Sequence, residues 1–545
     1  MTDQGSTGIP DPEGASDLID TEFEIGQDNI EGNVGPFGFD IHNPVFMISG
    51  LTVTAFVIYA LLAPDQAGSF FGWLRPTLTS TFDWFFLSAA NVFVIFCLGL
   101  IISPWGSVRL GGKEASPDYS YIGWFAMLFA AGMGIGLMFF GVLEPVYHMA
   151  ISQPLGVPSP IAEDGSIIAG NVDAAKKMGL AATIYHWGLH PWAIYAVVAL
   201  ALALFSFNKG LPLSIRSAFY PIFGERVWGW TGHVIDILAV FATLFGLATS
   251  LGLGAQQANA GLEYVYGVPN TITVQVILII GITSIALVSV LRGLDGGVKI
   301  LSEINMGIAA LLLLFVLIAG PTVAIFTDFL SGLTAYATDL VALSNPVGRT
   351  DDGYRQGWTA FYWAWWISWS PFVGMFIARV SRGRTVREFL TCVLIIPSLV
   401  CVLWMAVFGG VAIDQVLSDP ATSAVKANVI DSYHPELSLF AMLEGLPLAA
   451  ITSTIGIVLV IVFFVTSSDS GSLVIDTITA GGKVDAPVPQ RVFWCTFEGL
   501  VAIVLLIGGG LGSLQAMVIS TGLPFTLVLL LMCWAIFKGL LTEER

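Results

Sequence analysis

The residues whose types and spacing could do chemistry are aromatic side chains crowded into one apolar stretch, residues 361–372 (FYWAWWISWSPF). Four tryptophans, Trp363, Trp365, Trp366 and Trp369, fill roughly three helical turns of a segment that would otherwise reach the interior of a bilayer. Tryptophan usually collects at membrane–water interfaces, where its N–H stays hydrated, so an aromatic belt plus packing would explain one or two of them. This density instead favours a box of rings for a quaternary ammonium cation, which ring quadrupoles attract without hydrogen bonds.

A second aromatic group lies earlier in the chain, in residues 186–195 (HWGLHPWAIY). On a helix Trp192 and Tyr195 share one face, and Trp187 lies about 80° from Tyr195. Pro191 removes a backbone donor, so we expect it to bend the helix enough to gather the three rings. The two groups predict a binding site shared by two helices.

Two of the expected spans are interrupted in their interiors. One contains residues 130–136 (AAGMGIG), and the other is expected to break at Ser370-Pro371. Amides freed by such breaks are tolerated at membrane depth only where they are buried or line a cavity, although small residues could instead serve close helix packing. Interruptions at matching positions of two inverted halves favour a binding site near the middle of the membrane. The freed amides would receive a substrate carboxylate there, and the candidate residues are Gly132, Met133, Gly134 and Gly136.

Hydroxyl groups in the apolar segment 463–470 suggest a cation site. Thr466 and Ser467 offer adjacent oxygens, the hard ligands that a sodium ion needs. In a helix such hydroxyls also bond back to carbonyls one turn earlier, which would make them structural. Asp469 is either a conformational anchor or a partner for a buried ion.

Other polar residues carry less weight. Glu144 stands before Pro145, and we expect it to end its span in a structural role. His186 and His190 flank the second aromatic group, but two histidines with no nearby carboxylate make a weak metal motif. The five cysteines show no metal or redox spacing.

The elements that position these residues follow from composition. The 545-residue chain is 55% hydrophobic and 11% charged, which excludes a soluble domain and predicts a polytopic membrane protein. Residues 1–42 hold ten acidic residues and no Lys or Arg, so we expect a disordered tail that avoids nucleic acid and anionic lipid. Nothing in the chain suggests an enzyme.

We expect an all-α protein with twelve transmembrane helices and amphipathic or interfacial helices at 326–346 and 434–446. The spans lie near 44–63, 82–103, 122–149, 178–207, 231–265, 271–291, 302–325, 357–380, 386–412, 449–479, 490–511 and 515–538. Basic residues in the connecting segments divide fifteen against six when both termini are placed in the cytoplasm. The positive-inside rule therefore predicts a multi-pass protein of the cell (inner) membrane with both termini inside.

The ordered motifs resemble those of the betaine/choline/carnitine transporter family, and most closely its sodium-coupled glycine betaine symporters. They are GMGIGLMF at 132–139, Glu144-Pro145, His186-Trp187, HPWAIY at 190–195 and the tryptophan stretch. The resemblance implies LeuT-type inverted five-helix repeats preceded by two extra helices, and a homotrimer. The chain would then divide into a tail at 1–42 and a transporter domain at 43–545. The parts of that domain are leading helices at 43–121, a first repeat at 122–325, an interfacial helix and loop at 326–356, a second repeat at 357–538 and a short tail at 539–545.

The resemblance also implies roles for the candidate residues. Trp187, Trp192, Tyr195 and Trp366 match the central box around a trimethylammonium group, while Trp365 and Trp369 match aromatic residues that line the inward pathway. Thr466 and Ser467, with the carbonyls of Ala130, Met133 and Phe463, match the main sodium site. Gly136 stands where choline carriers have an aspartate, which predicts a preference for zwitterions over choline.

A second sodium site is expected to be incomplete. Thr243, Ser250 and Phe372 match positions associated with it, but Leu247 replaces an expected threonine. Thr249 faces about 200° away from that position and is a poor substitute.

These observations predict a secondary active transporter for the sodium-coupled uptake of a zwitterionic osmolyte, most simply glycine betaine. The alternatives are uptake of dimethylsulfoniopropionate or choline, sodium-independent exchange of carnitine or betaine, and a receptor or osmosensor that does not transport. The expected partners are the osmolyte, a sodium ion as coupling ion and the lipid bilayer, with no other cofactor.

Overall fold

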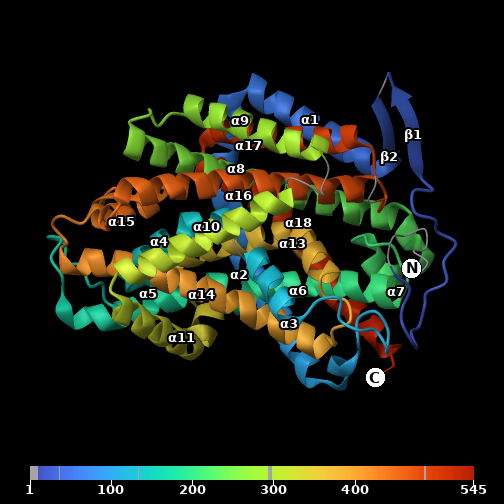
Figure 1. Ribbon diagram of the computed structural model, residues 1–545, viewed down its shortest axis with the longest axis horizontal. Helices are drawn as coiled ribbons and strands as arrows, with labels where there is room; N and C mark the ends of the chain where they lie inside the picture. Colours follow the sequence, from blue (N-terminus) through green and yellow to red (C-terminus); the bar gives the residue numbers. More distant parts are fainter. Residues whose placement is uncertain (1–9, 36, 133, 293–297, 484–485, 545) are drawn as a thin grey trace.

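The computed structural model describes residues 10–35, 37–132, 134–292, 298–483 and 486–544, and these form a bundle of helices (Figure 1). The first half contains α1 (Asn43–Leu62), α2 (Pro64–Ile102), α3 (Tyr121–Gly132), α4 (Ile135–Ala150), α5 (Val172–Trp187), α6 (Leu189–Ala203), α7 (Tyr220–Phe223), α8 (Trp230–Tyr266) and α9 (Ile272–Arg292). The second half contains α10 (Val298–Ala319), α11 (Thr322–Ser344), α12 (Asp352–Tyr354), α13 (Ala360–Arg379), α14 (Val386–Ser418), α15 (Ser438–Glu444), α16 (Ala449–Thr479), α17 (Val488–Gly509) and α18 (Leu511–Leu541). One two-stranded sheet, β1 (Asn29–Val34) and β2 (Phe37–His42), precedes them.

The helices confirm a polytopic membrane protein. Among the described residues, ten segments are long and apolar enough to cross a membrane, counting α5 and α6 together, and the count is eleven if α3 and α4 form one bent span. The helix α13 is not among them, because its tryptophans, serines and proline make it less apolar. The count of twelve spans therefore stays a prediction. α2 begins at Pro64, well before the expected residue 82.

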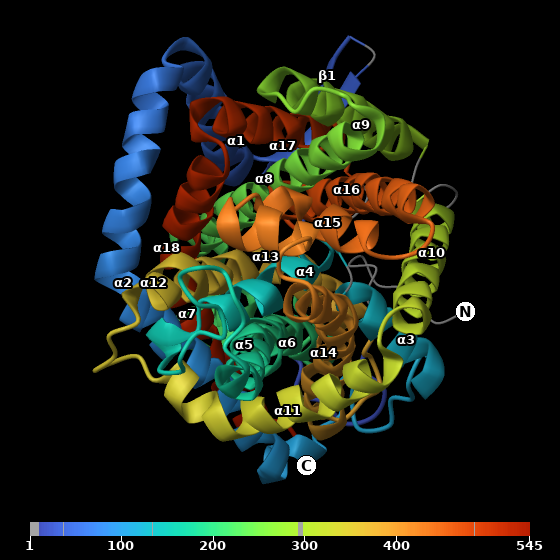
Figure 2. The same cartoon turned by 90° about the vertical axis from the view of Figure 1, so that its left-hand side faces the viewer.

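The centre of the bundle is built from α4, α6 and α13. α13 packs against α6, α8, α18 and α2, and α4 packs against α5 and α14. Viewed along the bundle, these central helices are surrounded by α1, α2, α9, α10 and α11 (Figure 2). The two aromatic groups of the sequence lie on α13 and on the α5–α6 pair, so the fold brings them together in the interior.

The expected interruption near residue 133 is present. α3 ends at Gly132, α4 begins at Ile135, and their axes differ by 69°. Gly134 lies between them in extended backbone (φ −177°, ψ −173°). The N-terminus of α4 is thereby placed inside the protein.

The bend that was predicted at Pro191 lies at Gly188 instead. The helix breaks at Gly188, whose backbone (φ −97°, ψ −129°) is not helical, between the end of α5 at Trp187 and the start of α6 at Leu189. Pro191 lies in the first turn of α6, where its missing N–H costs no helical hydrogen bond.

The break expected at Ser370-Pro371 is wrong, because α13 continues through both residues. A proline cannot donate to the carbonyl four residues earlier, here that of Ile367. The Ser370 hydroxyl donates to that carbonyl at 2.7 Å and replaces the missing bond. The structure therefore has an interruption at α3–α4 without a matching break in α13.

The expectation of a disordered acidic tail does not hold for residues 10–35 and 37–42. β1 and β2 form an antiparallel hairpin in which Asn29 lies opposite His42. Acidic residues of this segment pair with basic residues of distant loops: Glu13 with Arg382 (2.8 Å), Asp17 with Lys209 (3.3 Å), Glu31 with Lys483 (3.0 Å) and Asp40 with Lys483 (2.5 Å). The composition of residues 1–42 shows the acidic charges, but it does not show which basic residues elsewhere in the chain pair with them.

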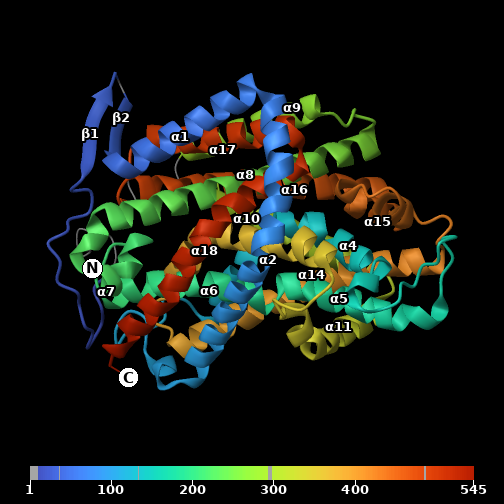
Figure 3. The same ribbon diagram turned by 180° about the vertical axis from the view of Figure 1, so that it is seen from behind.

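The hairpin and the C-terminal end of α18 lie at the same end of the bundle (Figures 1 and 3). Lys209 joins the segment before the hairpin to the residues after α18, since it pairs with Asp17 and, at 2.7 Å, with Glu543. This placement agrees with an even number of crossings.

Candidate functional site

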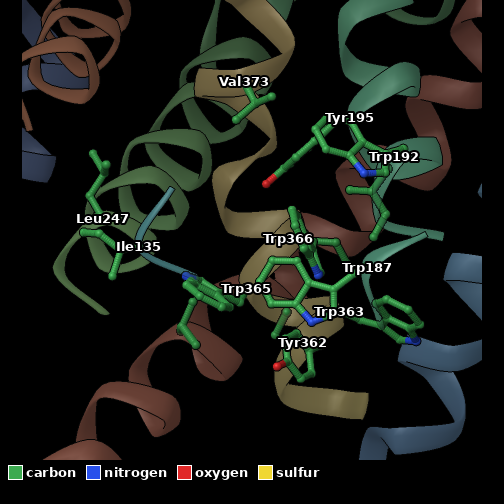
Figure 4. Packing of buried hydrophobic residues seen from close by; sticks show 14 of the residues in the cluster. Ile135, Trp187, Trp192, Tyr195, Leu247, Tyr362, Trp363, Trp365, Trp366 and Val373 are labelled. Carbon is green, nitrogen blue, oxygen red and sulfur yellow. The ribbon is translucent and has the colours of Figure 1, made fainter. Parts of the chain in front are cut away.

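A cavity of about 60 Å³ lies where α4, α6, α8 and α13 meet. Its wall contains five aromatic residues predicted from the sequence: Trp187, Tyr195, Trp365, Trp366 and Trp369. The rest of the wall is apolar or small: Ala131, Gly134, Ile135, Gly136, Leu137, Ser250 and Val373. No acidic or basic side chain lines it among the described residues. Figure 4 shows rings from the α5–α6 pair and from α13 facing one another across this region.

The rings meet mostly edge to face. Trp366 is central, with its centroid 5.2 Å from that of Trp187 at an interplanar angle of 85° and 5.2 Å from that of Tyr195 at 68°. Trp365 stands 6.4 Å from Trp366 on the side of the glycine segment. Perpendicular rings fix one another and present π faces in several directions.

The indole N–H groups of this wall are all occupied by protein acceptors. Trp187 donates to Glu144 Oε2 at 2.8 Å, and Trp365 donates to Ser250 Oγ at 3.1 Å. Trp366 and Trp369 donate to the carbonyls of His186 and Gly246, each at 3.1 Å. With these N–H groups bonded to protein, the four indole rings offer carbon surfaces to the cavity. Such a wall suits a cation that has no hydrogen to donate, such as a quaternary ammonium.

Trp192 differs from its predicted role because it does not line the cavity. It is fully buried and packs edge to face on Tyr195, with centroids 5.4 Å apart, and against Trp366 at 6.3 Å. Figure 4 shows it beside Tyr195, away from Trp365. Its place is support for the wall, which the helical periodicity could not distinguish from contact with a ligand.

The glycine segment meets the rings directly. Gly134 and Gly136 line the cavity, whereas Met133 lies outside the described residues and Gly132 ends α3. A Cβ built on Gly136 would lie 2.8 Å from Trp187 and 3.0 Å from Trp365, while one on Gly134 would meet nothing within 4 Å. Gly136 therefore leaves the room that these two rings occupy.

A buried carboxylate supports the wall from behind. Glu144 is fully buried; its Oε2 accepts hydrogen bonds from Trp187 at 2.8 Å and from the Tyr362 hydroxyl at 2.6 Å. Its Oε1 contacts His186 Nδ1 and lies 3.3 Å from His148 Nε2. The expectation that His186 has no nearby carboxylate is wrong, because the carboxylate of Glu144 contacts its ring. The two residues are 42 positions apart in the sequence. No local spacing signals this contact.

Glu144, His148 and His186 offer ligand atoms within 4.8 Å of one another, a set that could also hold a metal ion. Their direct hydrogen bonds, together with those from Trp187 and Tyr362, satisfy both carboxylate oxygens without one. The second ring nitrogen of His186 lies 2.9 Å from the Thr359 hydroxyl. His190, the other predicted histidine, instead bonds Asn91 at 2.9 Å and stacks on Trp363.

The residues matched to the main sodium site lie on two helices. Phe463, Thr466 and Ser467 belong to α16, and Ala130 lies near the end of α3. Thr466 donates to the carbonyls of Val462 (3.0 Å) and Phe463 (3.2 Å), the back-bonded arrangement considered above. A hydroxyl that donates still has lone pairs for a cation. Among the described residues no hydrogen bond joins Ala130 to the α16 residues, so the site stays a prediction.

The residues of the second sodium site are divided between different surroundings. Thr243 donates to Ala239 at 2.8 Å, and Phe372 packs on Trp369 with centroids 5.4 Å apart. Ser250 belongs to the cavity wall, where it accepts from Trp365. Thr249 bonds the carbonyls of Phe245 (2.8 Å) and Leu514 (3.1 Å), so its hydroxyl is directed to α18. Leu247 packs over Gly471 of α16.

Comparisons with known proteins identify the family of this chain. Residues 44–545 match the model of the betaine/carnitine/choline family of transporters. A glycine betaine/proline/choline transporter of Vibrio parahaemolyticus is 61% identical over 550 residues, covering 100% of this chain and 98% of the relative. Glycine betaine transporter 1 of the same organism is 55% identical over 531 residues, with 96% and 98% covered. A glycine betaine transporter of Bacillus subtilis is 42% identical over 504 residues, with 92% and 95% covered. These relatives are transporters and not enzymes, and the chain belongs to the betaine/carnitine/choline transporter family.

Proposed function

We propose that the protein takes up a zwitterionic quaternary ammonium osmolyte, glycine betaine first, driven by a sodium gradient. The observation that carries the substrate class is the wall of rings whose N–H groups are all bonded to protein acceptors. A cation–π contact in a water-free site contributes about 2 kcal/mol. Trp187, Tyr195 and Trp366 together would therefore select strongly for a methylated ammonium group over a neutral one.

The carboxylate end of the substrate has a place in the same cavity. α4 begins at Ile135, and its first residues line the wall, so backbone N–H groups that have no partner within the helix belong to the cavity wall. A helix N-terminus favours a negative group through these amides and the helix dipole. A zwitterion satisfies both ends of the site. Choline would use only the aromatic end, although the name of the 61% identical relative includes choline and proline.

The finer architecture is part of the same proposal. The proposed symporter has twelve crossings, two inverted five-helix repeats and cytoplasmic termini, and it assembles as a trimer in the inner membrane. Its main sodium ion is bound by Ala130, Met133, Phe463, Thr466 and Ser467. The interior break at α3–α4 supports alternating access, and the contacts of Lys209 with both Asp17 and Glu543 support an even span count. Thr243, Ser250 and Phe372 are proposed as an incomplete second site, since Thr249 is directed elsewhere.

The test is uptake of labelled glycine betaine into proteoliposomes that contain the purified protein. An inward sodium gradient should drive accumulation, and an equal potassium gradient should not. Accumulation that depends only on betaine or carnitine loaded inside, with no effect of sodium, would show exchange instead. Saturable binding without uptake in any gradient would show a receptor. Choline and dimethylsulfoniopropionate as competitors in the same assay define the substrate range.

A further inference from the structure

The buried carboxylate of Glu144 touches the aromatic wall without lining the cavity. It is fully buried, and two of the four side chains that bond it belong to the aromatic cluster: Trp187, a wall ring, and Tyr362, which packs edge to face on Trp187 with centroids 5.7 Å apart. One carboxylate oxygen holds both donors. The orientation of Trp187 is therefore tied to Glu144.

The network reaches the central ring as well. His186, which bonds Glu144 through Nδ1, accepts the indole N–H of Trp366 on its backbone carbonyl at 3.1 Å. Its ring stacks on Tyr362, with centroids 4.5 Å apart and planes 19° apart. Glu144 thus joins α4 to the end of α5 and to α13, the elements that carry the wall. Moving the carboxylate would move Trp187 directly and Trp366 through His186.

Charge is the second property of this residue. No Lys or Arg of the described chain pairs with Glu144; its partners are indole, phenol and imidazole groups. The cavity wall itself contains no acidic side chain. A negative charge in surroundings of low dielectric acts over several ångströms. Placed at the N–H edge of Trp187, it attracts a cation held on a face of the ring and repels an anion there.

We propose that Glu144 is a positioning and specificity-determining residue of the site, which orients Trp187 and Tyr362 and supplies the charge that makes the cavity prefer a cationic head group. The inference rests on the proposed function, because it assumes that an ammonium group occupies the cavity. It adds a residue outside the wall that sets the charge preference of the rings.

The test compares two ligands of the same shape. In 3,3-dimethylbutanoate a carbon replaces the ammonium nitrogen of glycine betaine, so the cation is absent and the carboxylate remains. The dissociation constants of both are measured by calorimetry on the full-length protein in nanodiscs, and their ratio is the readout. A role in packing alone changes both constants by the same factor and leaves the ratio unchanged.

Glu144→Gln removes the charge with little change in shape. Its amide oxygen can accept from Trp187 and Tyr362 as Oε2 does, and its NH₂ can donate to His186 Nδ1. We expect the preference for glycine betaine over its carbon analogue to fall at least fivefold. Glu144→Asp keeps the charge but is one methylene shorter. It should weaken both ligands while keeping the ratio within about twofold of the parent, because it loses position and retains charge.

Glu498→Gln is the matched control, since Glu498 is also a fully buried glutamate, on α17, and bonds Ser468 at 2.8 Å outside the wall. It should leave the ratio unchanged. If Glu144→Gln gives no folded protein by size exclusion, the double variant Glu144→Gln/Tyr362→Phe removes the charge and one of its donors together.

An unchanged ratio in folded Glu144→Gln or in the double variant overturns the inference, and so does an equal fall in Glu498→Gln. Failure of the parent protein to bind glycine betaine refutes the proposed function instead. The two failures are therefore distinguishable in one set of titrations.

Discussion

Replacing Gly136 by alanine should weaken substrate binding without unfolding the protein. The added Cβ would lie 2.8 Å from Trp187 Cη2 and 3.0 Å from Trp365 Cη2. Carbon atoms in contact are normally about 3.5 Å apart or more, so the two rings must retreat by roughly 0.5 to 0.7 Å. The open space beside them is the cavity of about 60 Å³.

The cost therefore falls on the bound state. In the free protein the rings relax into the cavity, whereas a bound ligand fills that space and prevents the movement. Overpacking of this kind costs about 1–3 kcal/mol, which is a loss of affinity of about five- to 150-fold. Calorimetric titration with glycine betaine measures the loss, and the thermal unfolding midpoint without ligand should stay close to that of the parent.

Gly134→Ala is the matched control. Gly134 lines the same cavity, but a Cβ there meets nothing within 4 Å, and its extended backbone (φ −177°) accepts any residue. It should bind substrate nearly as the parent does. Parent-like affinity in Gly136→Ala, or an equal loss in Gly134→Ala, would refute the reasoning from ring contacts.

The remaining predictions concern the rings, the cation and the N-terminal hairpin. Trp366→Leu should lower glycine betaine affinity at least tenfold, about 1.4 kcal/mol. Trp363→Phe, on the same helix but outside the cavity, should leave that affinity unchanged. Equal losses of affinity in the two variants, measured by titration, would show that Trp366 is not part of the site. Thr466→Ala/Ser467→Ala should abolish sodium stimulation of uptake. Thr249→Val should retain that stimulation, because the Thr249 hydroxyl bonds the carbonyl of Leu514. Uptake that is still stimulated by sodium in the double variant would show that Thr466 and Ser467 do not bind the coupling ion. Lys483→Met removes the pairs to Glu31 and Asp40, partly exposed contacts that each stabilise by about 1 kcal/mol or less, so protease cleavage within residues 10–42 should increase. High salt should produce the same increase in the parent by screening, and a cleavage rate indifferent to both changes would show that the pairs do not hold the hairpin.

The cavity wall was predictable because its signals are local. Tryptophan density in 361–372 is a property of one helix, α13, and Trp187 and Tyr195 belong to one short stretch of sequence, although the structure places Trp187 at the end of α5 and Tyr195 on α6. Gly136 also stood out as part of the glycine segment, and the resemblance implied that it sets a preference for zwitterions over choline. Its contacts with Trp187 and Trp365 show a role in space.

What could not be predicted depends on contacts between distant segments. Glu144 lies on α4 and His186 on α5, and the residues next to either one in the sequence do not predict their contact. The unbroken course of α13 depends on the Ser370 hydroxyl replacing one hydrogen bond, which a rule for proline alone misses. The acidic N-terminal segment is ordered by Arg382, Lys209 and Lys483, residues that composition assigns only to loops.

The central claim, that ring faces bind a cation in this cavity, is tested most directly by fluorinating one ring. Tryptophan at position 366 is replaced by its mono-, di- and trifluoro analogues, which keep the shape of the ring and withdraw negative potential from its face. The dissociation constant for glycine betaine is then measured for each protein. A stepwise rise in that constant with each added fluorine is the result predicted here, and a constant unchanged across the series would contradict binding by the ring faces.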